Sequence, residues 1–201
     1  MSQPSSRPSV AREPRTVRGV LTRIESICDN GPAPNFRQDR SAGMRGAKLS
    51  LYEAGIRMPF IVWGMAKIPK GKIDSASVIT ASDLLPSLCT LAGIKTNNTF
   101  DGEDRSNVLL GKPLPRTKEI YWEYGRNDIS FNYPGVKNNR SPGLAIRKDN
   151  WKLLTNKEGT VVELYDVSKD KNETINLAAV RGEIVKELYA KLMAWWEGLP
   201  R

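Results

Sequence analysis

The sequence of 201 residues contains no histidine, and this absence excludes several kinds of catalytic chemistry. Ser-His-Asp and Cys-His nucleophile systems use an imidazole as the base, and many zinc sites use it as a ligand. Cysteine is scarce as well, because Cys28 and Cys89 lie far apart and neither belongs to a Cys-x-x-Cys pair. The spacing of the cysteines therefore gives no indication of a metal–thiolate centre. The apolar neighbours of both cysteines favour small core side chains, although a disulfide between them stays open.

Long hydrophobic runs are missing too, and no stretch approaches the ~20 apolar residues of a membrane span. The first residues contain no apolar segment of about 7–15 residues, so no secretory signal is visible and the localisation stays open. The net charge is +9, but the basic residues are scattered and form no nucleic-acid-binding motif. We therefore expect neither a membrane nor a nucleic acid as a partner.

The stretch from Cys28 to Phe60 combines two kinds of polar chemistry. Asp29 and Asn30 precede Gly31, which places two oxygen donors of the kind that Ca²⁺ and Mg²⁺ prefer on a tight turn. On its own, this tripeptide is more often a plain turn than a metal site. Lys48 follows in a segment rich in Gly and Arg, and its ammonium group suits a sulfate or phosphate oxygen.

Three motifs in this stretch resemble the second half of the active site of the sulfatase family, part of the alkaline phosphatase superfamily. They read Asp29-Asn30-Gly31, Met44-Arg45-Gly46-Ala47-Lys48 and Tyr52-Glu53-Ala54-Gly55-Ile56-Arg57-Met58-Pro59-Phe60. The resemblance, which is arylsulfatase-like, implies that Asp29 and Asn30 ligate Ca²⁺, or sometimes Mg²⁺, and that Lys48 contacts the sulfate. Ala54 departs from the family pattern, which usually has a first glycine at this position.

Two arginines near Lys48 are further candidates for contacts to a substrate. Arg45 lies within the second motif and Arg57 within the third. The competing interpretation is that both form salt bridges with Glu53 or with aspartates, which would make them structural.

The nucleophile that the resemblance implies is absent from these residues. In the family it is a formylglycine made from the Cys or Ser of a Cys/Ser-x-Pro-x-Arg motif. The segment Ser6-Arg7-Pro8-Ser9-Val10 has valine in place of the arginine. The family's N-terminal aspartate pair and its active-site histidines are missing as well. Because Ca²⁺ takes about six to eight oxygen ligands, Asp29 and Asn30 alone predict weak metal binding and no sulfatase turnover by this chain.

Composition and resemblance together divide the chain into three parts. Residues 1–26, rich in Pro, Arg and Ser, are expected to form a disordered or unrelated tail. The resemblance starts abruptly at about Ile27, as in a truncated, frameshifted or mis-started reading frame. Residues 27–115 resemble the C-terminal part of a sulfatase-type α/β sandwich, and the Pro-rich segment 112–116 marks a boundary. Residues 116–201 are predicted to form a small α+β domain with an antiparallel sheet and one long C-terminal helix.

In the middle of the chain, the pattern predicts a loop over residues 31–57 and then two short strands and a helix. The strands are Met58–Val62 and Ser77–Thr80. The helix starts after an N-cap at Ser82 or Asp83 and stops at Gly93. Its leucines recur at spacings of three and four and predict a buried face, made of Leu84, Leu85, Leu88 and Leu91.

The last third of the chain alternates short β-like runs with turns rich in Asn, Gly and Lys. The runs are Glu119–Tyr124, Leu144–Arg147, Trp151–Leu154 and Val161–Tyr165. The residues from Glu163 to Ala178 again resemble the sulfatase family. An amphipathic helix over about Gly182 to Gly198 is expected to pack its apolar side, including two tryptophans, on the sheet.

These observations favour a sulfatase-family protein, which in the full-length family hydrolyses sulfuric esters. The resemblance implies a sulfate ester as partner, either a small molecule or a sulfated carbohydrate. Two alternatives stay open: a non-catalytic remnant or anion-binding module, and a fragment of a related phosphoryl-transfer hydrolase. The Arg-Gly-x-Lys setting of Lys48 favours sulfate over phosphate.

Overall fold

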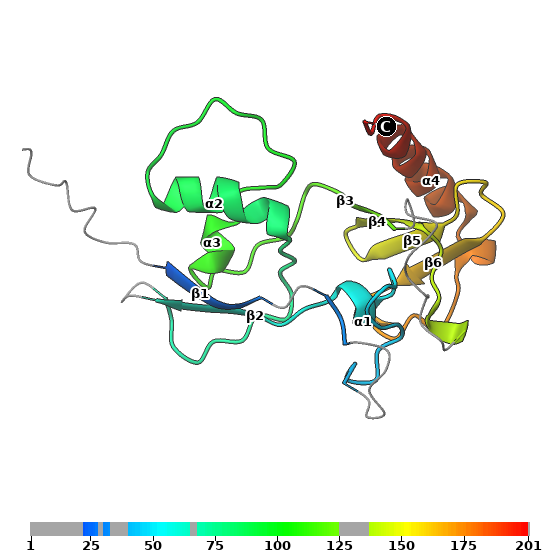
Figure 1. Cartoon of the computed structure of the whole chain (residues 1–201), viewed down its shortest axis with the longest axis horizontal. Helices are drawn as coiled ribbons and strands as arrows, with labels where there is room; N and C mark the ends of the chain where they lie inside the picture. Colours follow the sequence, from blue (N-terminus) through cyan, green and yellow to red (C-terminus); the bar gives the residue numbers. More distant parts are fainter. Residues whose placement is uncertain (1–21, 28–29, 33–39, 65–67, 125–136, 201) are drawn as a thin grey trace, which may run out of the picture.

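The computed structural model describes residues 22–27, 30–32, 40–64, 68–124 and 137–200, and it divides into two lobes (Figure 1). The hairpin lobe comprises the described parts of residues 22–27 and 60–118. The sheet lobe comprises the described parts of residues 119–200. Residues 44–57, named the Lys48 loop here, contain the short helix α1 (Glu53–Ile56) and lie against the sheet lobe.

The sheet lobe is built on a four-stranded antiparallel sheet in the order β3-β4-β5-β6. Each strand pairs with the next one along the chain, so the described connections within this sheet are simple turns. The turn between β4 and β5 is two residues long and places Asp149 at a φ of 52°. The strands are β3 (Ile120–Glu123), β4 (Leu144–Lys148), β5 (Trp151–Thr155) and β6 (Val162–Asp166). The predicted antiparallel sheet is confirmed.

Both faces of this sheet carry a core cluster. Successive side chains of a strand point to opposite faces, and in β5 Leu153 belongs to one cluster while Leu154 belongs to the other. The Leu153 face is covered by the helix α4 (Gly182–Glu197). The Leu154 face is covered by Leu51 and Tyr52 of the Lys48 loop. The strands are therefore apolar on both sides.

The long C-terminal helix packs on the sheet as predicted. Leu188 and Leu192 of α4 are fully buried in the cluster beneath the helix. Trp195 stacks on Tyr121 of β3 with ring centroids 5.0 Å apart and planes inclined by 15°. Trp196 donates from Nε1 to a Glu123 carboxylate oxygen at 3.1 Å. The tryptophans are thus packing residues that each contact β3.

The hairpin lobe contains a separate two-stranded antiparallel sheet made of β1 (Thr22–Ile27) and β2 (Phe60–Gly64). A register shift between Ile24 and Ser26 interrupts the pairing. The first strand starts at Thr22, inside the segment that was expected to be a disordered or unrelated tail, and the boundary of that segment at residue 26 stays a prediction. The second strand agrees with the run expected at residues 58–62, displaced by two residues.

A short 3-10 helix, η1 (Ala81–Asp83), leads into α2 (Leu84–Leu91), which contacts α3 (Ser106–Leu109). The helix stops as predicted, with Gly93 at a φ of 68°. Two expectations here are wrong. Residues 77–80 form no strand, and the predicted leucine face is not core, since Leu85 is 59% exposed and Leu88 38%.

The physical reason is that α2 is anchored by polar groups on its other side. Ser87, fully buried, donates from Oγ to the Asp83 carbonyl at 2.5 Å and accepts from the Arg105 backbone N–H at 2.7 Å. The leucine spacing correctly marks an apolar face, but no described element covers Leu85 and Leu88. Among the described helices, none combines the length and the apolar character needed to cross a membrane.

Candidate functional site

Two backbone hydrogen bonds bring the Asn30 segment alongside the Lys48 loop. The Gly31 N–H donates to the Gly55 carbonyl at 2.9 Å, and the Lys48 N–H donates to the Pro32 carbonyl at 2.9 Å. Gly31 is required by this approach, since a Cβ at that position would lie 1.8 Å from the Ala54 carbonyl oxygen. Asn30 and Lys48 are therefore held on neighbouring backbone segments. Asp29 lies outside the described residues.

The Lys48 loop is wound tightly on itself. The Ala54 N–H donates across the loop to the Arg45 carbonyl at 2.9 Å. Gly46, at a φ of 99°, uses a backbone conformation that side chains rarely adopt. A Cβ on Gly55 would lie 2.0 Å from the Ser50 carbonyl oxygen, so the loop closes on a glycine there. These constraints explain structurally why glycine stands in both the Arg-Gly-x-Lys and the Glu-x-Gly motifs.

A buried cluster of charges fixes this loop to the sheet lobe. Lys152 of β5 places its ammonium 3.0 Å from a Glu53 carboxylate oxygen and 2.9 Å from one of Glu173. The second Glu173 oxygen accepts the Glu53 backbone N–H at 2.6 Å. All three side chains are almost fully buried. Such a cluster is held by its partners, because removing one of them strands a buried charge.

The pKa values of the two carboxyls in the cluster are shifted in opposite directions. Burial alone raises the pKa of the Glu53 carboxyl, but the Lys152 ammonium, with Arg147 and Arg57, brings this pKa below its ordinary value. Burial also raises the pKa of Glu173, and Lys152 offsets only part of that rise. One ammonium therefore faces two carboxyls, and Glu53 is the one that stays ionised most readily.

Arg45, a candidate for substrate contact, is engaged with the sheet lobe on several sides. Its guanidinium lies 3.8 Å from the centroid of the Tyr52 ring and donates to the Tyr165 hydroxyl at 3.0 Å. It also lies 3.7 Å from a Glu163 carboxylate oxygen. The Tyr52 and Tyr165 hydroxyls both donate to Glu163. These contacts give Arg45 a structural role; its contact with substrate stays a prediction.

Arg57, the other candidate, forms the salt bridge that the competing interpretation expected. Its guanidinium lies 3.7 Å from a Glu53 carboxylate oxygen, one helical turn back along the chain. The side chain is otherwise exposed, so part of it stays accessible to solvent. A contact with substrate likewise stays a prediction for Arg57.

The described residues do not by themselves fit a Ca²⁺ or Mg²⁺ ion. Among them, no three His, Cys, Asp or Glu side chains gather as metal ligands would. Asn30 offers one amide oxygen, whereas Ca²⁺ takes about six to eight oxygens. Asp29 and Asn30 remain candidate ligands that require further donors from other residues.

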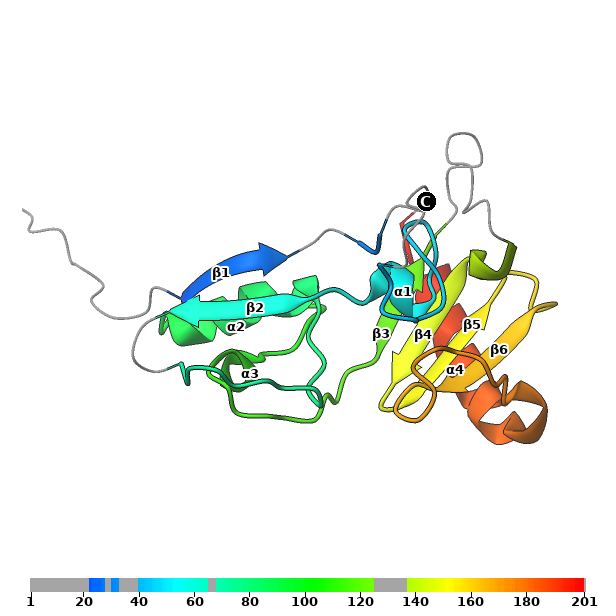
Figure 2. The same cartoon turned by 90° about the horizontal axis from the view of Figure 1, so that it is seen from below.

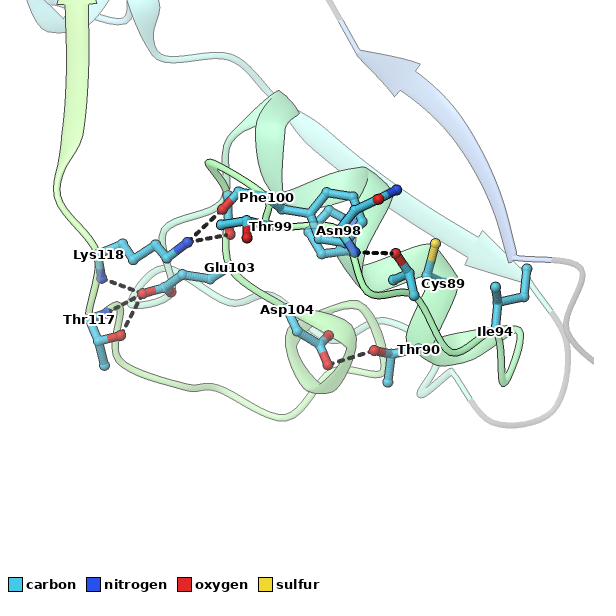
Figure 3. A pocket seen from close by; sticks show the side chains of 13 residues that line it. Cys89, Thr90, Ile94, Asn98, Thr99, Phe100, Glu103, Asp104, Thr117 and Lys118 are labelled. Carbon is cyan, nitrogen blue, oxygen red and sulfur yellow. Dashed lines mark hydrogen bonds between the residues drawn. The ribbon is translucent and has the colours of Figure 1, made fainter. Parts of the chain in front are cut away.

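A separate pocket of about 480 Å³ lies in the hairpin lobe, and Figure 3 shows the residues around it. Two of its charged side chains form hydrogen bonds with other residues that line the pocket. Lys118 donates to the Phe100 carbonyl at 2.7 Å, and Glu103 accepts from the Thr117 hydroxyl at 2.7 Å. Cys89, half-buried, also lines it. None of the predicted site residues is among those lining this pocket, which we assign to the structure of the lobe.

The sequence did not identify Lys152 and Glu173 as residues that support the site. Their partner Glu53 is about a hundred residues away from both along the chain. The available signal was the family resemblance of residues 163–178, which contain Glu173. That resemblance marks the position without saying which residue it contacts.

Solved structures of similar fold are sulfatases. One, from work on glycosaminoglycan metabolism by Bacteroides thetaiotaomicron, has a TM-score of 0.58 and 27% identity, over 76% of this chain and 32% of that one. Another, a 2-O GAG sulfatase, has a TM-score of 0.56 and 30% identity, over 73% of this chain and 31% of that one. The described fold is therefore that of part of a sulfatase.

The family model for the C-terminal region of N-sulphoglucosamine sulphohydrolase matches residues 47–197, well over half of the chain. The chain therefore belongs to the sulfatase family. It is 30% identical over 160 residues to an N-acetylgalactosamine-6-O-sulfatase of Bacteroides thetaiotaomicron, covering 72% of this chain and 28% of that protein. It is 33% identical over 160 residues to an uncharacterised sulfatase of Schizosaccharomyces pombe, covering 77% and 27%. The chain thus spans less than a third of the length of these relatives.

Proposed function

We propose that this chain supplies part of a site that hydrolyses sulfate esters. In this proposal Lys48 contacts the sulfate, and Asp29 and Asn30 are two of the ligands of a divalent cation. The observation that carries it is the pair of 2.9 Å backbone hydrogen bonds that holds the Asn30 segment against the Lys48 loop. Family membership supports the same assignment, because the three motifs stand in the family order.

The ammonium group of Lys48 is the part of this site that acts directly on a sulfate. A positioned cationic donor near the sulfate oxygens stabilises the negative charge that they carry throughout hydrolysis. Its position depends on the loop, whose backbone is tied to Pro32 on one side and to the sheet lobe on the other. Lys48 is thereby held by the fold rather than by a free surface segment.

The chain contains no residue in the Cys/Ser-x-Pro-x-Arg setting of the family nucleophile. We therefore expect no hydrolysis from this chain alone. The nucleophile and the remaining metal ligands come, in this proposal, from the part of a sulfatase that the 201 residues do not include.

For the substrate, we propose a sulfated carbohydrate. Two relatives are named for such substrates, an N-acetylgalactosamine-6-O-sulfatase and a Delta 4,5-hexuronate-2-O-sulfatase, both of Bacteroides thetaiotaomicron. They are 30% and 31% identical to this chain over the matched residues. The class of substrate is proposed on this basis, and the particular sugar is left open.

Isothermal titration of the chain with sodium sulfate, in the presence of Ca²⁺, tests the proposal. We expect saturable heat from the natural chain and at least tenfold weaker binding by Lys48→Ala. Lys169→Ala is the matched control, since Lys169 is an exposed lysine of the sheet lobe, and it should bind like the natural chain. Equal binding by Lys48→Ala, or no heat from either ligand, would contradict the proposal and favour a non-catalytic remnant.

A further inference from the structure

The outer face of the β1–β2 hairpin carries large apolar side chains with nothing over them among the described residues. Ile61 is 54% exposed and Trp63 is 59% exposed. Because side chains alternate along a strand, these two lie on the same face of β2. Figure 2 shows that α2 lies along one side of the hairpin and that no described element lies on the other.

The pairing of this sheet is incomplete as well. It has two strands, so β1 and β2 each leave one edge without a partner strand among the described residues. An isolated two-stranded hairpin is marginally stable in water, and an exposed apolar edge is a template for pairing with another chain. The hairpin therefore has the features of two strands taken from a larger sheet.

The neighbouring helix adds to the exposed apolar surface of this lobe. Leu85 and Leu88, three residues apart, lie on one face of α2, and both are exposed. Ile94, which follows the helix, is 59% exposed. The sheet lobe, by contrast, covers its sheet on both faces. The apolar exposure thus concentrates in the lobe whose sheet is incomplete.

We propose that this face, centred on Ile61 and Trp63, is a docking surface for the sheet-bearing portion of a sulfatase chain that these 201 residues do not contain. The relatives' lengths argue for that occupant. The matched residues make up 28% of the Bacteroides thetaiotaomicron relative, and the solved structures match over 31–32% of their chains. In this proposal the rest of such a chain supplies strands that pair with the open edges of the hairpin and side chains that cover its apolar face.

This inference rests on the proposed function, because the docked portion is also the source of the missing nucleophile. It adds the surface through which the site is completed. A second copy of this chain is the competing occupant. It would cover the apolar face without contributing a nucleophile, since both copies lack the motif.

The test mixes the full 201-residue chain with a recombinant fragment of the Bacteroides thetaiotaomicron N-acetylgalactosamine-6-O-sulfatase, namely the portion that precedes its matched residues. Light scattering after size-exclusion chromatography reports the complex. We expect a one-to-one complex whose dissociation constant rises at least tenfold with Trp63→Glu. Val180→Glu is the matched control, because Val180 is 68% exposed on the sheet lobe, and it should leave binding unchanged.

A second measurement covers the case in which the separate fragments associate too weakly. The same fragment is fused to the N-terminus of the full 201-residue chain, and hydrogen exchange is compared between the fusion and the chain alone. We expect at least tenfold slower exchange in β2 and α2 and unchanged exchange in β5. Unchanged exchange in β2 would overturn the proposal, as would a homodimer of the chain that Trp63→Glu dissociates.

The Lys48→Ala variant separates this inference from the proposed function. It should bind the fragment as the natural chain does while losing sulfate binding. If the fragment binds through Trp63 and Lys48→Ala still binds sulfate normally, the docking surface stands and the sulfate assignment fails. The opposite result is that sulfate binding depends on Lys48, but no complex forms and hydrogen exchange in β2 is not slowed. That result would refute the docking surface and leave the sulfate assignment standing.

Discussion

In the sheet lobe, apolar clusters cover both faces of the β3–β6 sheet, whereas in residues 60–64 and 68–118 of the hairpin lobe the large apolar side chains that are buried are those of Leu109 and Pro86. The hairpin lobe instead buries polar and charged groups. Asp83 and Arg105 are among its most deeply buried side chains. Two neighbouring parts of one chain thus depend on different interactions.

A network of polar groups connects the segments of the hairpin lobe. Asp83 accepts from the Thr80 backbone N–H at 2.7 Å and from the Glu103 backbone N–H at 2.8 Å, and its carboxylate lies 2.6 Å from the Arg116 guanidinium. Arg105 donates to the carbonyls of the Pro-rich segment, including that of Pro115 at 2.7 Å. These bonds fix geometry, but each contributes a modest net free energy.

The sheet lobe therefore buries enough apolar surface to resemble an independently folded domain. The hairpin lobe buries little apolar surface and resembles a fragment of a larger domain. Apolar burial is the main source of folding free energy. A lobe that buries mostly polar groups keeps its shape through specific bonds and gains little from removing surface from water. Three experiments sharpen this comparison.

The largest effect is expected from Lys152→Met, which leaves the buried Glu53 and Glu173 carboxyls without their ammonium partner. The free energy of unfolding should fall by about 3–5 kcal/mol at pH 7, measured by urea titration. In the natural chain the pKa of Glu53 is lowered, so the stability it contributes is present at neutral pH and is lost as the pH falls below its ordinary pKa. The deficit of the variant should therefore shrink at pH 4.

Lys169→Met is the control for this change, because Lys169 is exposed and forms an ion pair with the nearby Asp166 on the surface. It should leave the unfolding midpoint nearly unchanged. A deficit for Lys152→Met that is as large at pH 4 as at pH 7 would show that the loss is one of packing rather than of charge pairing.

A matched pair of leucine truncations compares the two lobes directly. Leu154→Ala removes a fully buried side chain between the sheet and the Lys48 loop and should cost about 2–5 kcal/mol. Leu88→Ala truncates an exposed leucine of α2 and should change stability by no more than about 0.5 kcal/mol. Urea unfolding of both variants checks the difference. Equal losses would mean that α2 is covered in solution.

Among the three substitutions of buried side chains, the smallest effect is expected from Arg116→Met, which removes the cation beside Asp83. The change should cost about 1–3 kcal/mol and should speed hydrogen exchange in α2 while leaving β5 unaffected. Burial raises the pKa of Asp83, but Arg116 and backbone donors bring it below its ordinary value. Its stabilisation is therefore present at neutral pH and lost as the pH falls below that value, so the variant and the natural chain should converge in acid.

Lys112→Met provides the comparison for Arg116→Met, since Lys112 is an exposed residue of the same Pro-rich segment. Its exchange rates should match those of the natural chain. Faster exchange in β5 of the Arg116→Met variant would contradict the view that the two lobes open separately.

The sheet lobe was largely predictable because its signals are local. Alternation along the β-like runs and turn residues between them indicate hairpins, and the leucine and tryptophan spacing indicates a helix. Each of these patterns is confined to a few neighbouring residues. The sequence could therefore predict the element types, and it placed all four strands of this lobe within one residue of their observed ends.

The packing of these elements on one another could not be predicted, because it depends on contacts between residues that are distant in the sequence. Nothing in the local pattern shows that Leu51 and Tyr52, in a segment predicted as a loop, cover a face of a sheet a hundred residues later. Likewise, the leucine spacing of α2 predicts an apolar face but does not say whether a partner covers it. Of the candidate site, the motifs marked Asn30 and Lys48, whereas the hydrogen bonds between their segments and the Lys152 cluster that fixes the loop came only from the structure.

The packing of the Lys48 loop on the sheet lobe also sets an order of events during synthesis. Chains emerge from the ribosome from the N-terminus, and a segment folds only when its partners are available. The loop needs Lys152 and Glu173, so it stays without its supports until more than a hundred further residues have been made. The residue proposed to contact sulfate is among the earlier ones synthesised and among the later ones to reach its final position.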